Sequence, residues 1–325
     1  MKVLLTGASG FVGSHVLDAL AARGIPTVVL LRPTSNHRFI ASHLATVEVR
    51  PGSITDPASL SAVMRGITHV IHCAGLVKAV HAADLFAVNR DGTRNMVAAV
   101  NASRVERLVH VSSLAVSGPG TTAAPAREAA PPAPVSAYGR SKLAAEEEVI
   151  AHCRTAFTIL RPAAVYGPRD GEFLRLFKAA RAHVLPTCGG GRQELSLVFV
   201  SDLAAVILAS LAHPAAPGRV FHVASGEICT MRQLTTEIAR QLGVRTLPLP
   251  LPNAVLWSIC ALAQAAARLT GRPTVLAHGK VRELTAPGWV ADTGQLRTTL
   301  ALACPTGLPE GMAATRAWYV QEGWL

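Results

Sequence analysis

Short apolar runs rich in β-branched residues recur through the first half of the chain. They occupy residues 3–5, 28–31, 47–49, 69–72, 108–111 and 158–160, and stretches with helical periodicity, such as 14–23 and 85–102, lie between them. Strands that are apolar on both faces and alternate with helices are typical of a parallel sheet covered by helices on both sides. The pattern therefore predicts an α/β fold with a doubly wound parallel sheet of Rossmann type.

A glycine-rich turn follows the first predicted strand directly and opens the next helix. Its sequence is Thr-Gly-Ala-Ser-Gly-Phe-Val-Gly. Glycines at this spacing allow a tight turn, a close approach of backbone N–H groups to a pyrophosphate, and close contact between helix and strand. We predict a dinucleotide site here, and the residues of the turn that we assign to it are Gly7, Ser9, Gly10, Phe11, Val12 and Gly13.

The end of the second predicted strand indicates which dinucleotide binds. An acidic residue at this place binds the ribose hydroxyls of NAD, whereas a basic residue accommodates the 2′-phosphate of NADP. This chain has Arg32, with Arg38 close by and no carboxylate between them. We predict NADP as the cofactor, with NAD as the alternative, because some NAD enzymes tolerate a basic residue at this place.

The candidate catalytic residues are a tyrosine, a lysine and a serine. Tyr138 and Lys142 are four residues apart at the start of a predicted helix, so their side chains share one face. A free tyrosine has a pKa of about 10, so a nearby ammonium is needed before it exchanges a proton with an alcohol or carbonyl. Ser113, at the end of a predicted strand, is placed to hold the reacting oxygen.

Together these segments resemble the extended short-chain dehydrogenases/reductases, that is, the NAD-dependent epimerase/dehydratase family, in its hydroxysteroid dehydrogenase and dihydroflavonol reductase-like branch. Further matches lie in order along the chain at residues 72–75, 88–93, 161–168 and 199–204. The resemblance implies that Ser113 and Tyr138 bind the reacting oxygen, that Tyr138 exchanges the proton, and that Lys142 binds the nicotinamide ribose. The other cofactor contacts that it implies are Ser53, Ile54, Cys73, Ala74, Gly75, Ser112, Pro162 and Val165.

Two departures from the family pattern are informative. Ser53 presents a hydroxyl where many relatives have a carboxylate against the adenine. Leu114 and Ala115 stand where sugar-nucleotide dehydratases carry an acid pair, and apolar side chains transfer no protons. The dehydratase subclass is therefore excluded.

The resemblance also divides the chain. It implies a dinucleotide-binding domain over residues 1–165, to which part of 196–212 returns, and a smaller C-terminal substrate-binding lobe over 166–325. Candidate lining residues of the lobe are Phe173, Phe177, Gln193 and Leu195. The most apolar segment, 247–269, falls short of the roughly 20 apolar residues that a membrane span requires, so we predict no integral span. We expect a core or lid helix there, with a substrate cover or membrane-surface contact as the alternative.

These residues are compatible with three classes of function. An apolar lobe without a nucleotide-sugar signature favours an NAD(P)-dependent oxidoreductase that interconverts a secondary alcohol and a carbonyl on a lipophilic small molecule. The alternatives are a nucleotide-sugar epimerase with tightly held NAD and a non-catalytic NAD(P)-binding sensor.

Composition narrows the partners. The 31 Lys and Arg residues exceed the 20 Asp and Glu residues, but they are dispersed and aromatic residues make up 5%, so we predict no nucleic-acid partner. The spacing of the 6 cysteines and 12 histidines predicts reduced thiols and no metal site. Because the chain lacks the apolar core of a signal peptide, we expect it in the cytoplasm.

We expect residues 146–148, all glutamates, on a solvated helix face. The resemblance implies a homodimer formed by helices near 84–102 and 138–152.

Overall fold

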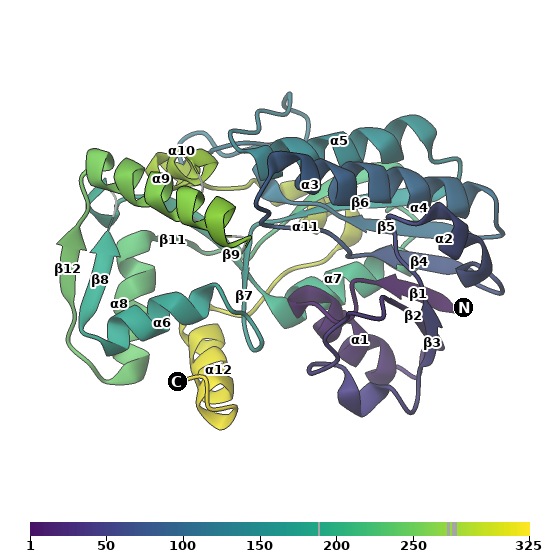
Figure 1. The fold of residues 1–325 in the computed structure, drawn as a ribbon, viewed down its shortest axis with the longest axis horizontal. Helices are drawn as coiled ribbons and strands as arrows, with labels where there is room; N and C mark the ends of the chain where they lie inside the picture. The colour runs from purple at the N-terminus through teal and green to yellow at the C-terminus, as the bar shows by residue number, and fades with distance from the viewer. Residues whose placement is uncertain (188, 272–273, 275–277) are drawn as a thin grey trace.

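The computed structural model describes residues 1–187, 189–271, 274 and 278–325. A seven-stranded sheet in the order β10-β6-β5-β4-β1-β2-β3 dominates the first half, and every pairing in it is parallel (Figure 1). Its strands are β1 (Val3–Thr6), β2 (Thr27–Leu31), β3 (Glu48–Pro51), β4 (His69–His72), β5 (Arg107–Val111), β6 (Ala156–Pro162) and β10 (Arg219–Val223). The predicted doubly wound Rossmann-type sheet is confirmed.

Helices cover both faces of this sheet, which is why β1 and β2 are buried along their whole length. One face carries α1 (Phe11–Ala22), α7 (Val200–Ala212) and α11 (Gly294–Leu300). The other face carries α2 (Pro57–Val63), α4 (Gly92–Asn101) and α5 (Ala137–His152), and α3 (Ala82–Phe86) packs against α5. Because α7, β10 and α11 all follow residue 165, the return of the chain to the sheet extends beyond residues 196–212.

The helix predicted over residues 85–102 is interrupted. It is divided into α3, a π-helical turn over Ala87–Asp91, and α4. The wider turn brings Asn89 inside, where its side chain accepts a hydrogen bond from the N–H of Leu76 at 2.7 Å and donates to Ser141 Oγ at 2.9 Å. Asn89 thereby ties the loop after β4 to α5.

The remaining elements form the smaller lobe. Its strands are β7 (Ala164–Tyr166), β8 (Val184–Thr187), β9 (Glu194–Phe199), β11 (Ile228–Thr230), β12 (Leu247–Pro250) and β13 (Gly288–Trp289). Its helices are α6 (Phe173–Arg181), α8 (Met231–Leu242), α9 (Asn253–Thr270), α10 (His278–Thr285) and α12 (Leu308–Gln321). A separate core that includes Tyr166, Phe177, Ile238 and Tyr319 holds α6, α8 and α12 together.

The apolar segment 247–269 forms β12 and α9 rather than a core helix. Only Leu256, Cys260 and Ala267 of α9 are buried, and the first two pack against Val281 of α10. The core alternative of this expectation is therefore wrong, because α9 lies on the surface of the lobe, and the lid alternative stays a prediction (Figure 1). No helix in the described ranges combines the length and the hydropathy that crossing a bilayer requires.

Candidate active site

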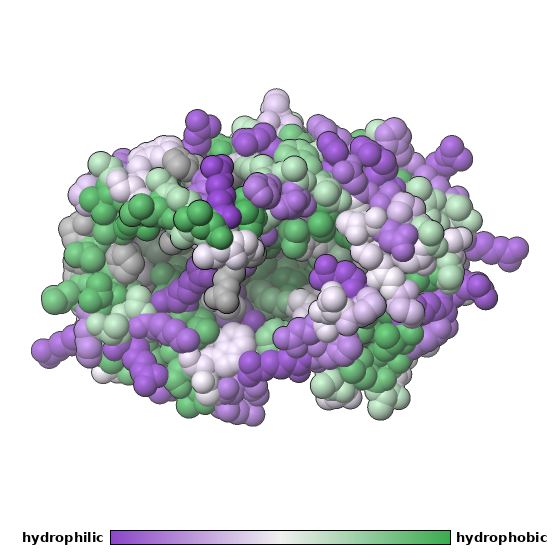
Figure 2. Space-filling view, viewed as in Figure 1, coloured by the Kyte–Doolittle hydropathy of each residue, from purple (hydrophilic) through white to green (hydrophobic). Residues whose placement is uncertain are grey.

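The parallel sheet brings the predicted site residues to one edge. The carboxyl ends of neighbouring parallel strands open on the same side of a sheet, and ligands of such folds bind there. Gly7 follows β1, Arg32 follows β2, Ser53 follows β3, Cys73 follows β4 and Ser112 follows β5. Figure 2 shows the molecule hollowed in the middle of the drawn face, between the lobe and the Rossmann half.

The glycine turn is built so tightly that side chains would not fit. Gly7 has a φ of 74°, and a Cβ there would lie 2.7 Å from the backbone N of Ala74. A Cβ on Gly13 would lie 2.1 Å from the carbonyl oxygen of Gly7. Gly10 is the N-cap of α1 and no side chain caps this helix, so its first N–H groups are available to an anion. These features fit the pyrophosphate of a dinucleotide.

We expect Gly13→Ala to impair cofactor binding. The added methyl group must push the Gly7 carbonyl away, which costs about 1–3 kcal/mol of folding free energy and distorts the turn. The affinity for NADPH, measured by ligand-induced thermal stabilisation, should fall about tenfold or more. Gly226→Ala is the matched control, because nothing lies within 4 Å of a Cβ at that position. Unchanged affinity in Gly13→Ala would count against a site at this turn.

The two arginines near β2 differ in their surroundings. Arg32 is exposed, its backbone N–H donates to Ser35 Oγ at 3.1 Å, and its guanidinium has no carboxylate partner within the described part of the chain. Arg38 instead donates to Glu322 Oε2 at 3.2 Å and lies over the ring of Trp324 at 5.1 Å. The C-terminal segment therefore occupies Arg38, and Arg32 is the cation at the strand edge.

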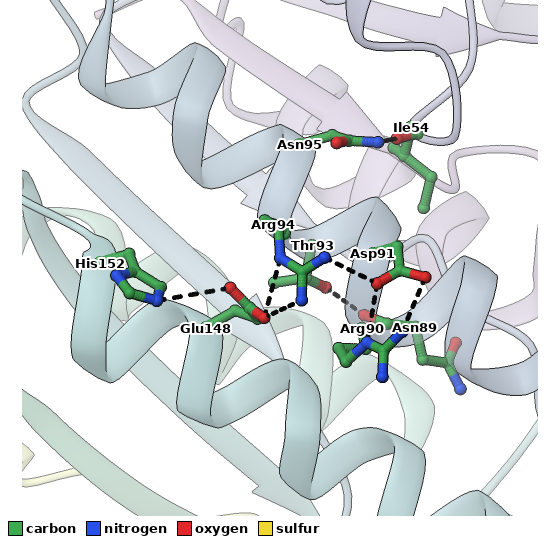
Figure 3. Close-up of polar contacts among 9 residues, drawn as sticks. All are labelled: Ile54, Asn89, Arg90, Asp91, Thr93, Arg94, Asn95, Glu148 and His152. Carbon is green, nitrogen blue, oxygen red and sulfur yellow. Dashed lines mark hydrogen bonds and ion pairs between the residues drawn. The ribbon is translucent and has the colours of Figure 1, made fainter.

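The other predicted cofactor residues divide into surface and core positions. The Ser53 hydroxyl bonds the Thr55 hydroxyl at 2.8 Å beside the end of β3. Ile54 is buried with its side chain against Gly92, so only its backbone faces the edge, where its carbonyl accepts from Asn95 Nδ2 at 2.9 Å (Figure 3). Pro162 is buried in β6, and Val165 packs on the core beneath α1 and α7.

Tyr138, Ser113 and Lys142 come together at the edge. The half-buried phenol of Tyr138 lies beside the Ser113 hydroxyl, which accepts a hydrogen bond from the N–H of Ala115 at 3.2 Å. Desolvation raises the pKa of Tyr138 above its ordinary value, so the phenol is protonated at neutral pH. Lys142 is 5% exposed, and its Nζ donates to the carbonyl oxygen of Val111 at 2.8 Å. Burial lowers the pKa of Lys142 to about 8.

Gly75 borders Lys142. A Cβ on Gly75 would lie 3.9 Å from Lys142 Nζ and 3.0 Å from Asn89 Oδ1. The segment Cys73–Gly75 thus forms the wall opposite the lysine, and the N–H of Ala74 donates to Thr6 Oγ1 at 3.2 Å. A ligand group in contact with Gly75 would therefore lie next to the ammonium group of Lys142.

The Ser112 side chain faces inward, and its predicted contact with the cofactor stays a prediction. Its hydroxyl donates to the Glu146 carboxylate, which also forms an ion pair with Arg161 of β6 at 2.6 Å. Both charged side chains are at most 5% exposed. Glu146 lies one turn beyond Lys142 on α5, so the periodicity of this helix is the signal that would have located it.

The expectation of a solvated glutamate face on α5 is therefore wrong for Glu146, and Glu148 also has partners. Arg94 of α4 donates to Glu148 Oε1 at 2.6 Å, and His152 lies 3.8 Å from Glu148 Oε2 (Figure 3). These contacts join α4 to α5 on the face that the family resemblance assigns to dimerisation. Homodimerisation through this face stays a prediction.

A cavity of about 430 Å³ lies in the lobe between the loop after β5, the start of α9 and the end of α10. Gln193 lines it and donates to the carbonyl oxygens of Glu283 at 2.9 Å and Ala286 at 2.8 Å. The negative charge of Glu283, near the end of α10, contributes to raising the pKa of Tyr138. Of the other candidate lining residues, Phe177 and Leu195 are buried in the lobe core and Phe173 packs against it.

Known proteins match the chain along most of its length. Residues 3–224 match the model of the NAD dependent epimerase/dehydratase family. Ceramide reductase of Caulobacter vibrioides is 32% identical over 324 residues, which are 99% of this chain and 96% of that protein. UDP-glucose 4-epimerase of Vibrio cholerae is 28% identical over 332 residues, 98% of this chain and 96% of that protein. The solved structure of MoeE5 with UDP-glucuronic acid and NAD has a TM-score of 0.79 at 24% identity, covering 99% of this chain and 100% of that one.

Proposed function

Because this chain belongs to the NAD-dependent epimerase/dehydratase family of extended short-chain dehydrogenases/reductases, we propose that it reduces a ketone of a lipophilic substrate with NADPH. The observation that carries the proposal is the placement of Tyr138 beside Ser113, with Lys142 one turn further along α5, at the edge where the glycine turn lies. A nicotinamide cofactor, when bound, supplies the hydride that the carbonyl carbon accepts.

The residues of this chain handle the proton and the developing charge. Tyr138 donates its phenolic proton to the carbonyl oxygen as that oxygen becomes an alkoxide, and the raised pKa keeps this proton available. The Ser113 hydroxyl donates a hydrogen bond to the same oxygen. Lys142 has two N–H donors beyond the one that Val111 accepts, and these bind the ribose hydroxyls of the cofactor.

The lipophilic substrate class has two supports. The lobe exposes a large apolar surface on α9 and β12, and the bacterial relative at 32% identity is a ceramide reductase. We would incubate the purified chain with NADPH and a series of long-chain ketones and β-keto lipids and follow NADPH oxidation. Turnover that increases with chain length is the expected result. Absence of NADPH oxidation with every ketone would refute the proposal.

A nucleotide-sugar epimerase is the second candidate, because UDP-glucose 4-epimerase of Vibrio cholerae matches 98% of the chain. Epimerases regenerate their cofactor in each cycle and consume none. Interconversion of UDP-glucose and UDP-galactose by a sample that oxidises no NADPH with ketones would replace the reductase proposal with this one.

We expect Arg32→Asp to change the cofactor preference. The exposed guanidinium of Arg32 is placed to bind a 2′-phosphate, whereas an aspartate would repel this group and accept hydrogen bonds from ribose hydroxyls. NADPH affinity should fall about 10- to 100-fold, and NADH affinity should rise, in a thermal-shift titration. Arg38→Gln is the control, because Glu322 and Trp324 already occupy Arg38. Stronger stabilisation of the unmodified chain by NADH than by NADPH would contradict the assignment.

A further inference from the structure

The outer side of α9 carries a continuous apolar stripe. Val255, Ile259, Leu262 and Leu269 are spaced by four, three and seven residues, so they line one face of the helix. Leu262 is 72% exposed and Leu269 is 88% exposed. Figure 2 shows hydrophobic side chains gathered over this part of the lobe. Such large exposure of adjacent leucines is typical of an interaction surface.

The neighbouring strand pair extends this stripe. Leu247 and Leu249 of β12 are 75% and 50% exposed, and Val184 of β8, which pairs with Leu247, is 41% exposed. We call the stripe of α9 and these three residues the apolar face of the lobe. Its α9 residues lie on a different side of the helix from Leu256 and Cys260, which pack against α10.

Positive charges predominate around the apolar face, with Glu237 of α8 and Glu283 of α10 at its borders. From residue 238 to residue 282 the sequence has six Lys or Arg residues and no Asp or Glu. Arg245, Arg268 and Arg282 of this segment are exposed, as are Lys178 and Arg181 on the adjacent α6. Two copies of the face brought together would set these cations against one another, which disfavours a symmetric dimer. An apolar stripe bordered by more cations than anions is instead complementary to an anionic lipid surface.

We propose that the apolar face of the lobe docks onto an anionic phospholipid membrane. The stripe of α9 lies in the plane of the membrane with its leucines among the acyl chains, and the arginines beside it bind lipid phosphates. The chain lies on the bilayer and does not cross it.

The position of the face connects it to the site. Asn253, the first residue of α9, lines the cavity of the lobe together with Leu284 and Thr285 of α10. A membrane in contact with α9 would therefore extend to the wall of the cavity. A lipid would then pass from the membrane into the cavity without crossing water. Membrane binding itself does not depend on the proposed reductase activity.

Vesicle flotation tests the proposal. We would mix the full chain with vesicles of phosphatidylglycerol and phosphatidylcholine, and with vesicles of phosphatidylcholine alone. We expect binding to the anionic vesicles that weakens as salt is added, because salt screens the attraction. No binding to the anionic vesicles, or equal binding to both kinds that salt leaves unchanged, would overturn the proposal.

Two sets of variants locate the surface. Leu262→Ser with Leu269→Ser should lower the partition coefficient about tenfold or more, because two exposed leucines no longer enter the acyl layer. The control Val49→Ser with Val320→Ser removes exposed apolar side chains of β3 and α12 and should bind as the unmodified chain does. Arg245→Gln with Arg268→Gln should weaken binding to anionic vesicles more than Arg154→Gln with Arg219→Gln, which changes exposed arginines elsewhere.

Circular dichroism and cofactor-induced thermal stabilisation establish that each variant is folded. Sedimentation velocity tests whether a second copy of the chain, rather than a membrane, covers the apolar face. If the serine pair converts a dimer into a monomer and leaves vesicle binding unchanged, the apolar face belongs to a second copy of the chain and the proposal is wrong. Because flotation needs no turnover, failure of the ketone screen would leave this result intact.

Discussion

Tyr138→Phe should lower kcat for ketone reduction by about a hundredfold to ten-thousandfold, the usual range for loss of a general acid. The change removes the only proton that the phenol can donate, and the Ser113 hydroxyl loses its partner. The ring stays in place, so the cofactor site at the glycine turn is unaffected. Stopped-flow or steady-state NADPH oxidation measures the effect, and NADPH-induced thermal stabilisation should be preserved.

Tyr166→Phe is the matched control for this prediction. Tyr166 is buried in the lobe core, and its hydroxyl lies 3.5 Å from the carbonyl oxygen of Gly307, at the limit of a hydrogen bond. Its replacement should leave turnover close to that of the unmodified chain. Equal turnover in Tyr138→Phe and the unmodified chain would remove Tyr138 from the mechanism and favour a cofactor-binding sensor.

Arg161→Met should destabilise the fold by about 3–5 kcal/mol, because it leaves the Glu146 carboxylate buried without its cation. Arg161 Nη1 also donates to Ser117 Oγ at 3.1 Å, and Ser117 bonds His222 Nε2 at 2.8 Å, so β6 also loses this side-chain connection to β10. Urea denaturation with fluorescence detection measures the change in the free energy of unfolding.

Two variants distinguish a buried charge from a lost contact. Arg94→Met breaks the ion pair with Glu148, but the Glu148 side chain is 11% exposed against 1% for Glu146 and keeps His152 at 3.8 Å, so the loss should be smaller. Arg161→Met combined with Glu146→Leu leaves neither charge, and it should recover part of the stability that Arg161→Met loses. If Arg161→Met is as stable as Arg94→Met, water reaches the Glu146 carboxylate.

Ser112 illustrates how the buried ion pair affects the site. Ser112 and Ser113 follow β5 directly, and sequence reasoning assigned the first to the cofactor and the second to catalysis. In a strand, consecutive side chains point to opposite sides. Ser113 reaches Tyr138, and Ser112 consequently points to Glu146 in the interior. The pair of serines thus connects the catalytic edge to the core.

The sequence by itself determined the sheet, the glycine turn and the Tyr138–Lys142 pair, because each depends on short-range features. Strand and helix periodicities, the steric limits on a turn and the geometry of one helix turn are all set within a few residues. Segments 3–5 and 28–31 therefore predicted β1 and β2 closely.

Only the tertiary structure decided which side chains are buried and which are paired, since those properties depend on residues distant in the chain. Glu146 of α5 forms an ion pair with Arg161 of β6, and Arg38 forms one with Glu322 near the C-terminus. The apolar segment 247–269 has the composition of a core helix, yet α9 packs on α10 through Leu256 and Cys260 and leaves Leu262 and Leu269 in solvent. Hydropathy indicates how favourable the burial of an apolar side chain would be. The packing of the whole chain determines whether another surface covers that side chain.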